Sequence, residues 1–128
     1  MSLWRGDVTR DEVAWADEAA MARDASRVPA LIRMLDSADQ DVVAAAADAL
    51  GHIGPPALDA WRSLARLLAR SDMEPWVRDT AAYALGQIGA RDPVAIAALE
   101  SAAGEDNTNV AQCAREALAV LSSTGGVT

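Results

Sequence analysis

Three kinds of side chain in this sequence offer candidates for chemistry: one histidine, one cysteine and a set of scattered carboxylates. His52 and Cys113 are each the only residue of their type, so neither a histidine cluster nor a multi-cysteine metal site can form. Cys113 has no base or metal partner near it in the sequence, which favours an ordinary helix residue over the alternative of a reactive thiol. We therefore expect no catalytic residues, no metal and no cofactor.

The carboxylates are better suited to binding than to acid–base catalysis, because nothing in their spacing isolates one pair for proton transfer. Asp48, Asp79 and Glu116 lie outside the apolar stripes of their segments, so we expect them on a surface other than the one that faces the core. Together with Asp41 they would give that surface a negative potential, which attracts an Arg- or Lys-rich segment. The alternative is a solvated face in a protein that is acidic throughout.

Two aromatic residues could anchor a partner on the same surface. Trp76 and Tyr83 are seven residues apart, which is two turns along one helix face. Aromatic side chains often anchor interfaces because they bring a large contact area at a low entropy cost. The alternative is that Trp76 packs between structural units, where burial contributes about 2–3 kcal/mol. His52 is either a further contact residue or a bystander.

The segments that carry these residues are copies of one another. Residues 49–54 read Ala-Leu-Gly-His-Ile-Gly and return 35 positions later as Ala-Leu-Gly-Gln-Ile-Gly in residues 84–89. A degraded third copy, residues 117–122, follows after another 33 positions. A period of this length predicts stacked supersecondary units, each unable to bury its apolar face alone.

Each copy is predicted to be a pair of helices. The second helix of each pair starts near Val42, Val77 and Val110, and apolar residues then recur at helical spacing. We place one α-solenoid domain over residues 1–122, with repeats at 26–54, 57–89 and 92–122 and a flexible tail at 123–128. A capping box at Thr9–Glu12 predicts a preceding cap helix over residues 9–23, with a buried stripe of Ala14, Trp15, Ala19 and Ala22.

Two glycines inside the second helices are expected at close helix–helix contacts. Gly51 and Gly86 occupy the same register, although Gly costs about 1 kcal/mol relative to Ala within a helix. A cost repeated at one register suggests that a neighbouring helix approaches there. The third copy has Ala119 at this position, so the requirement is not absolute.

Residues 76–89 resemble the second helix of HEAT-like repeats of the phycobilisome-lyase type, whose pattern is Val-Arg-x-x-Ala-Ala-x-Ala-Leu-Gly-x-Ile-Gly. Residues 42–54 match it with Val43 in place of Arg, and residues 110–122 match it most loosely. The resemblance covers about residues 26–122. It implies an all-α, right-handed α-α superhelix of the HEAT/armadillo-like solenoid type, with the first helices on the convex side and the second helices lining a concave groove.

The variable positions of this pattern, with the residues just before each Val, imply the lining of the groove. We take these as the partner-binding residues: Asp41, Asp48, His52, Trp76, Asp79, Tyr83, Gln87, Gln112 and Glu116. The pattern also places Ala44, Ala45, Thr80, Cys113 and Val120 on this surface. Some HEAT-like enzymes are iron-dependent hydroxylases with repeated His-Glu pairs, but His52 is followed by Ile53, which excludes that chemistry here.

Composition narrows the class of protein and of partner. Hydrophobic residues make up 52% of the chain but aromatics only 4%, which predicts a core of Ala, Leu, Val and Ile. The longest apolar runs are about six residues, far short of the roughly 20 that span a bilayer, and the N-terminus has no stretch like a signal peptide's. We expect a soluble cytoplasmic protein. The net charge of −8 and the absence of Lys disfavour nucleic acid, and they reflect either coding bias or salt adaptation.

Three functions remain open at this stage. The first is a non-catalytic protein-binding module or scaffold that holds a partner protein or peptide, expected to be basic, in the groove. The second, by analogy alone, is a subunit or chaperone of a bilin-lyase-like or other cofactor-handling complex. The third is a homo-oligomer formed through an exposed terminal helix, since a short stack has a large end surface relative to the size of its core.

Overall fold

The fold is a row of helices in two layers. The computed structural model describes residues 3–106 and 108–125, and among them no strand is present. The α-helices are α1 (Leu3–Ala22), α2 (Val28–Met34), α3 (Gln40–Ile53), α4 (Trp61–Ala69), α5 (Pro75–Ile88), α6 (Pro93–Ala103) and α7 (Thr108–Gly125). Short 3-10 helices at Ala25–Arg27 and Pro55–Ala60 precede α2 and α4. No helix in the described part of the chain is both long and apolar enough to cross a membrane.

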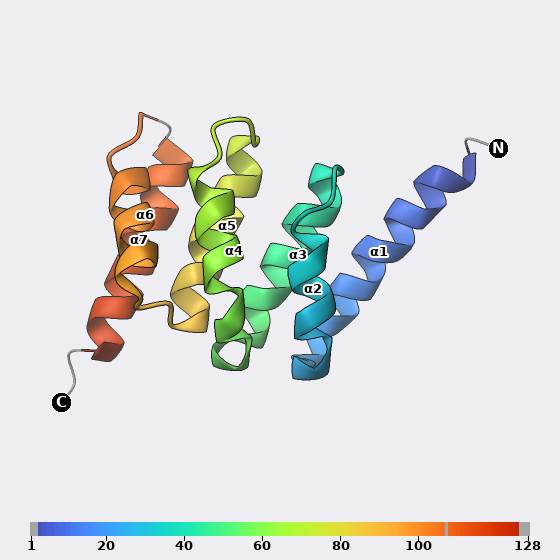
Figure 1. Ribbon diagram of the computed structural model, residues 1–128, viewed down its shortest axis with the longest axis horizontal. Helices are drawn as coiled ribbons and strands as arrows, with labels where there is room; N and C mark the ends of the chain where they lie inside the picture. The colour runs from blue at the N-terminus through green and yellow to red at the C-terminus, as the bar shows by residue number, and fades with distance from the viewer. Residues whose placement is uncertain (1–2, 107, 126–128) are drawn as a thin grey trace.

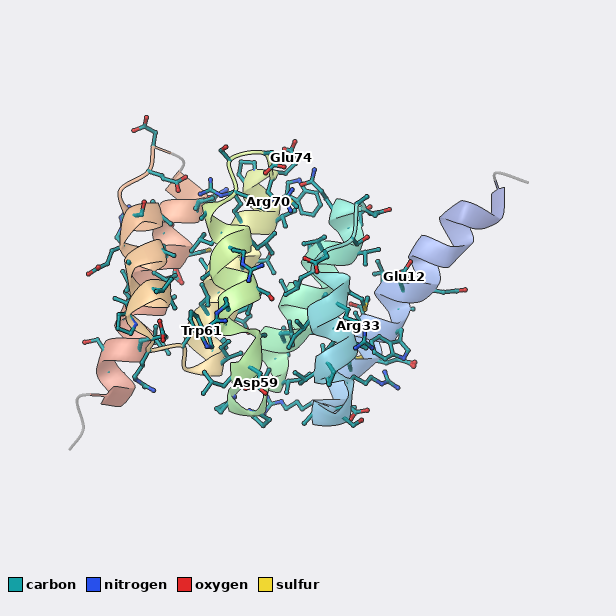
Figure 2. All side chains as sticks on the ribbon, in the orientation of Figure 1. Glu12, Arg33, Asp59, Trp61, Arg70 and Glu74 are labelled. Atoms are coloured by element: carbon teal, nitrogen blue, oxygen red, sulfur yellow. The ribbon has the colours of Figure 1, made fainter. Side chains whose placement is uncertain are left out.

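The helices form three hairpins that stack side by side (Figure 1). Within each hairpin α2 packs on α3, α4 on α5 and α6 on α7, while between hairpins α3 packs on α5 and α5 on α7. We call the outer surface of α3, α5 and α7 the second-helix face and that of α2, α4 and α6 the first-helix face. Figure 2 views the first-helix face, with Arg33, Trp61 and Arg70 labelled. The arrangement confirms the predicted all-α HEAT-like solenoid.

Local sequence explains where the helices begin and end. Asp39 caps α3, since its Oδ1 accepts a hydrogen bond from the Asp41 N–H at 2.9 Å, and Asp92 caps α6 in the same way. Proline occupies the first turn of α5 and α6, where its missing N–H costs nothing. Gly89 follows α5 with φ of 79°, a left-handed conformation that only glycine adopts readily.

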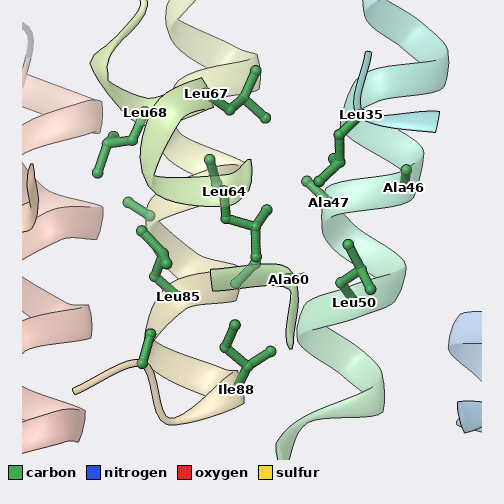
Figure 3. Packing of buried hydrophobic residues seen from close by; sticks show 14 of the residues in the cluster. Leu35, Ala46, Ala47, Leu50, Ala60, Leu64, Leu67, Leu68, Leu85 and Ile88 are labelled. Atoms are coloured by element: carbon green, nitrogen blue, oxygen red, sulfur yellow. The ribbon is translucent and has the colours of Figure 1, made fainter. Parts of the chain in front are cut away.

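Repeated sequence positions have repeated environments in the core. Val42, Val77 and Val110 are each no more than 1% exposed. Figure 3 shows Leu50 of α3 facing the leucines and isoleucine of α4 and α5, so the hairpins share one apolar core. Leu118, the third counterpart of Leu50 and Leu85, is only partly buried, because no described helix packs beyond α7. No side chain that is buried among the described residues is polar or charged.

The N-terminal helix differs in detail from the prediction. It packs against α3 and so stands beside the first hairpin, but it begins at Leu3, so the capping box at Thr9 lies inside the helix and not at its start. Between residues 11 and 22, Ala16 and Ala19 are fully buried, in the C-terminal half of the helix that converges on α3 (Figure 1). The predicted burial of Ala14 and Ala22 is therefore wrong, since both are exposed.

The C-terminal end also differs from the predicted tail. The last helix, α7, continues to Gly125, so residues 123–125 are helical. Residues 126–128 lie outside the described part of the chain.

Candidate functional site

Two recesses on the second-helix face share one wall. The first, of about 190 Å³, lies between α3 and α5; its lining is Arg23, Gly51, His52, Ile53, Gly54, Pro55, Tyr83 and Gln87. The second, of about 160 Å³, lies between α5 and α7; its lining is Tyr83, Gln87, Cys113, Glu116, Ala117 and Val120. Tyr83 and Gln87 thus separate two hollows that follow one another along the stack.

The Tyr83 ring is placed by a glycine in the neighbouring repeat. A Cβ on Gly51 would lie 2.8 Å from the Tyr83 Cε2 atom, which no real Cβ contact tolerates. Gly51 therefore lets the aromatic ring of α5 lie directly over the backbone of α3. The His52 ring stands beside it, with ring centroids 5.9 Å apart and planes tilted by 54°.

His52 is held by its own helix. Its Nδ1 lies 2.9 Å from the Asp48 carbonyl oxygen and 3.5 Å from the Asp48 Oδ1 atom. Both side chains are about half exposed, at 45% for His52 and 46% for Asp48. His52 lines the first recess, and this contact places the Asp48 carboxylate beside the imidazole.

Burial and carboxylate charge shift the pKa values around the shared wall. The pKa of Tyr83 is raised, first by burial and then by the charge of Asp48, with Arg23 opposing. Burial raises the pKa of Asp79, and its hydrogen bond with Thr80 offsets part of this shift. The pKa of the Cys113 thiol is raised by burial and then by the charges of Asp79 and Glu116. The neutral thiol is thus favoured, as expected for an ordinary helix residue.

Carboxylates of three successive helices lie near the residues of the shared wall, and among the described residues Glu116 is the one that lines a recess. Asp48 on α3 acts on Tyr83, and Asp79 on α5 and Glu116 on α7 both act on Cys113. Among the described residues Arg23 is the one cation that lines either recess. The local charge is therefore negative, which suits a cationic ligand.

Five of the nine predicted site residues line neither recess: Asp41, Asp48, Trp76, Asp79 and Gln112. Asp41 is exposed in the first turn of α3, where its N–H serves the Asp39 cap. Trp76 is 45% exposed in the first turn of α5, two turns before Tyr83. Gln112 donates a hydrogen bond from Nε2 to the Glu116 Oε1 atom at 3.1 Å.

Sequence reasoning missed Arg23 as a lining residue. Arg23 follows α1 with φ of 49°, a positive value that is uncommon for a residue other than glycine. This backbone conformation turns the chain toward α2 and leaves Arg23 beside the first recess. It lies outside the repeats, so no periodic signal pointed to it.

A site for a metal ion is not found among the described side chains. No group of three or more His, Cys, Asp or Glu residues within the described ranges is placed to hold one. The recesses are also smaller than the 300–1,000 Å³ typical of small-molecule pockets. The arrangement suits contact with side chains of a partner better than enclosure of a small molecule.

Comparison with known proteins agrees with the architecture. The family model described as HEAT repeats matches residues 28–119, which is well over half of the chain and runs from the start of α2 into α7. A search of curated proteins returns no match. The two-layered stack of helix hairpins and this match place the chain in one family: it belongs to the HEAT repeat proteins.

Proposed function

We propose that this chain is a non-catalytic protein-binding module whose second-helix face holds a basic segment of a partner protein. HEAT repeats generally mediate protein–protein interaction, and the family is typically non-enzymatic. The stacked hairpins provide the surface on which such a segment would lie. The side chains on that surface, and not the fold itself, determine what the chain binds.

The observation that carries this proposal is the negative charge around Tyr83 and Gln87, which separate the two recesses and which we call the Tyr83 wall. Glu116 lines the second recess, the Asp48 carboxylate contacts the lining residue His52, and the charge of Asp79 acts on the lining residue Cys113. These three carboxylates belong to successive helices and surround the partly buried Tyr83 ring. A segment that crosses the helices would place basic side chains near Asp48 and Glu116 and an apolar side chain against Tyr83. Opposite charges would speed the encounter and fix the register, while the aromatic contact would supply affinity.

An affinity capture experiment tests the proposal. The triple variant Trp76→Ala, Asp79→Asn, Tyr83→Ala removes both aromatics and one carboxylate of this surface, and we expect it to lose partner capture while keeping its helicity. The matched control Leu58→Ala, Asp59→Asn removes an exposed apolar side chain and a carboxylate from the turn before α4. Capture that is unchanged in the triple variant, or lost equally in the control, rejects the assignment of the second-helix face.

The alternative of a bilin-lyase-like or other cofactor-handling subunit has less support. Neither recess, at about 160 and 190 Å³, offers the volume that a tetrapyrrole needs. The phycobilisome-lyase subtype of the repeats therefore remains a prediction from the sequence pattern. We expect a flat visible spectrum after incubation with bilin and gel filtration, and retained bilin absorbance would revive this alternative.

A further inference from the structure

The first-helix face carries a larger recess that is almost wholly apolar. It has a volume of about 360 Å³ and lies between α4 and α6. Trp61, Ala65 and Ala69 line it from α4, and Val94 and Ala98 line it from α6. Figure 2 shows Trp61 at one end of α4, on the side facing α6. We call this recess the α4–α6 groove.

The groove exists because the two helices meet through small side chains. Ala65, Ala69 and Ala98 are too short to fill the space between neighbouring first helices. Val94 is 63% exposed at its edge, so a large apolar side chain already faces solvent there. The floor thus offers apolar surface whose burial by a ligand would be favourable.

Two arginines give this groove a charge opposite to that of the whole chain. Arg62 and Arg66 are one turn apart on α4 and both line it. The Arg62 guanidinium lies over the Trp61 ring, 5.2 Å from the centroid. Within the described ranges neither arginine forms an ion pair with a carboxylate, whereas Arg70, one turn further, is paired with Asp72. In a chain of net charge −8, two such guanidiniums mark a local site for anions.

We propose that the α4–α6 groove binds an acidic amphipathic helix of a partner protein. The apolar floor selects a helix with an apolar stripe, and the arginine pair selects carboxylates beside that stripe. From Trp61 to Ala69 the floor is about 12 Å long, which matches roughly two helical turns of a ligand. The proposal does not depend on the second-helix face, because it concerns the opposite layer and the opposite charge.

Binding of designed peptides to the full chain tests this proposal. The first probe is a fluorescein-labelled helical peptide with leucines at i, i+3, i+4 and i+7 flanked by glutamates. The second replaces each glutamate with lysine, and the third replaces each leucine with serine. Fluorescence anisotropy should show saturable binding of the first peptide alone, weakening as salt is added. Failure of the first peptide to bind, or equal binding of the second or third, overturns the proposal.

Charge-reversal variants locate the binding site. Arg62→Glu with Arg66→Glu should weaken binding of the first peptide at least tenfold, with circular dichroism unchanged because both side chains are exposed. The matched control Arg33→Glu with Arg115→Glu makes the same charge change at exposed positions on α2 and α7, and it should weaken binding less than threefold. Equal weakening by both pairs would mean a non-specific charge effect and would reject the site.

A variant without a charge change provides an independent check. Ala98→Leu extends an apolar side chain into the groove from α6 and should also weaken binding of the first peptide. Unchanged affinity in this variant would reject the groove as the site. If sedimentation shows self-association of the wild type that Arg62→Glu with Arg66→Glu abolishes, the occupant is a second copy of the chain, and the proposal of a separate partner fails.

Discussion

Gly86 on α5 lies directly against Ala117 on α7: a Cβ on Gly86 would be 2.9 Å from the Ala117 Cα atom. The same relationship occurs one repeat earlier, where a Cβ on Gly51 would be 3.1 Å from the Ala84 Cα atom. The glycine in the second helix of one repeat thus lies against the corresponding alanine in the second helix of the next repeat: Gly51 against Ala84, and Gly86 against Ala117. The third copy has Ala119 instead, which is exposed and has no further described helix to receive.

The first prediction concerns this contact. Gly86→Ala should lower the free energy of unfolding by roughly 1–3 kcal/mol, because the backbone of α7 must move away and this outweighs the gain in helix propensity. Gly51→Ala should cost less, since its nearest neighbour is the Tyr83 ring, a side chain that can shift. Urea unfolding followed by circular dichroism measures both changes.

Gly104→Ala is the control for these substitutions. Its nearest neighbour would be the Ser101 carbonyl oxygen at 3.6 Å, an ordinary contact, and the residue has negative φ. We expect little change in stability for this variant. A Gly86→Ala protein as stable as the wild type would contradict the close contact between repeats.

The second prediction concerns an ion pair that ties two hairpins together. Arg78 on α5 donates from Nε to the Leu68 carbonyl oxygen at 2.7 Å and from Nη1 to the Glu105 Oε1 atom at 2.8 Å. Its side chain is only 12% exposed. Arg78→Met, which keeps the apolar part of the side chain, should cost roughly 1–3 kcal/mol in urea unfolding. A cost below 0.5 kcal/mol would show that these bonds add nothing to stability.

The same pair predicts a pH dependence. The hydrogen bond from Arg78 lowers the pKa of Glu105 below its ordinary value of 4.5, so the folded state favours the ionised carboxylate. The resulting stabilisation is present above the ordinary pKa and is lost as the pH falls through the lower folded value. The difference in stability between wild type and Glu105→Gln should therefore shrink from pH 7 to pH 3. A constant difference over this range would contradict the ion pair.

The third prediction separates binding from stability at Asp79. Burial raises the pKa of this carboxyl, so its contribution favours folding at low pH and is lost as the pH rises through the folded pKa. At pH 7 the charged group therefore opposes folding. Asp79→Asn should raise the thermal unfolding midpoint slightly while it weakens binding of a basic peptide. Reduced stability together with unchanged binding would argue against Asp79 as a contact residue.

The fourth prediction addresses self-association through α7. Leu118 is partly buried and Val120 is 36% exposed, whereas Leu50 and Leu85, the counterparts of Leu118, are fully buried by the next repeat. The uncovered end of α7 predicts a dimer at high protein concentration that Ala119→Glu dissociates, because Ala119 is exposed at the register where a further repeat would pack. Sedimentation velocity over a hundredfold concentration range decides the matter, and a wild-type monomer throughout removes this prediction.

The fold was predictable because its determinants recur in the sequence. The spacing of Val42, Val77 and Val110 predicted three second helices, and these residues have equivalent buried environments. The glycines at 51 and 86 predicted close approach, which the structure confirms. The bounds and buried residues of the N-terminal helix were predicted less accurately. This helix occurs only once in the described chain, so its prediction depended on a single capping box and not on a repeated pattern.

The surfaces were harder to predict, because they depend on which helices are neighbours. The Tyr83 wall needed α3 and α7 on either side of α5, and only the family pattern suggested this arrangement. The α4–α6 groove results from alanines of two different hairpins, and the short alanine side chains gave no local signal. Arg23 reaches its recess through a backbone conformation that sequence periodicity does not encode.

The most direct test of the proposed function is to map a basic ligand onto the folded chain. A titration of the ¹⁵N-labelled protein with an arginine-rich peptide gives the residues in contact from their amide shifts. We predict saturable shifts centred on His52, Tyr83, Gln87 and Glu116. The double variant Asp48→Asn, Glu116→Gln should weaken binding of the peptide at least tenfold. Shifts confined to the first-helix face, or none at millimolar peptide, would contradict the account.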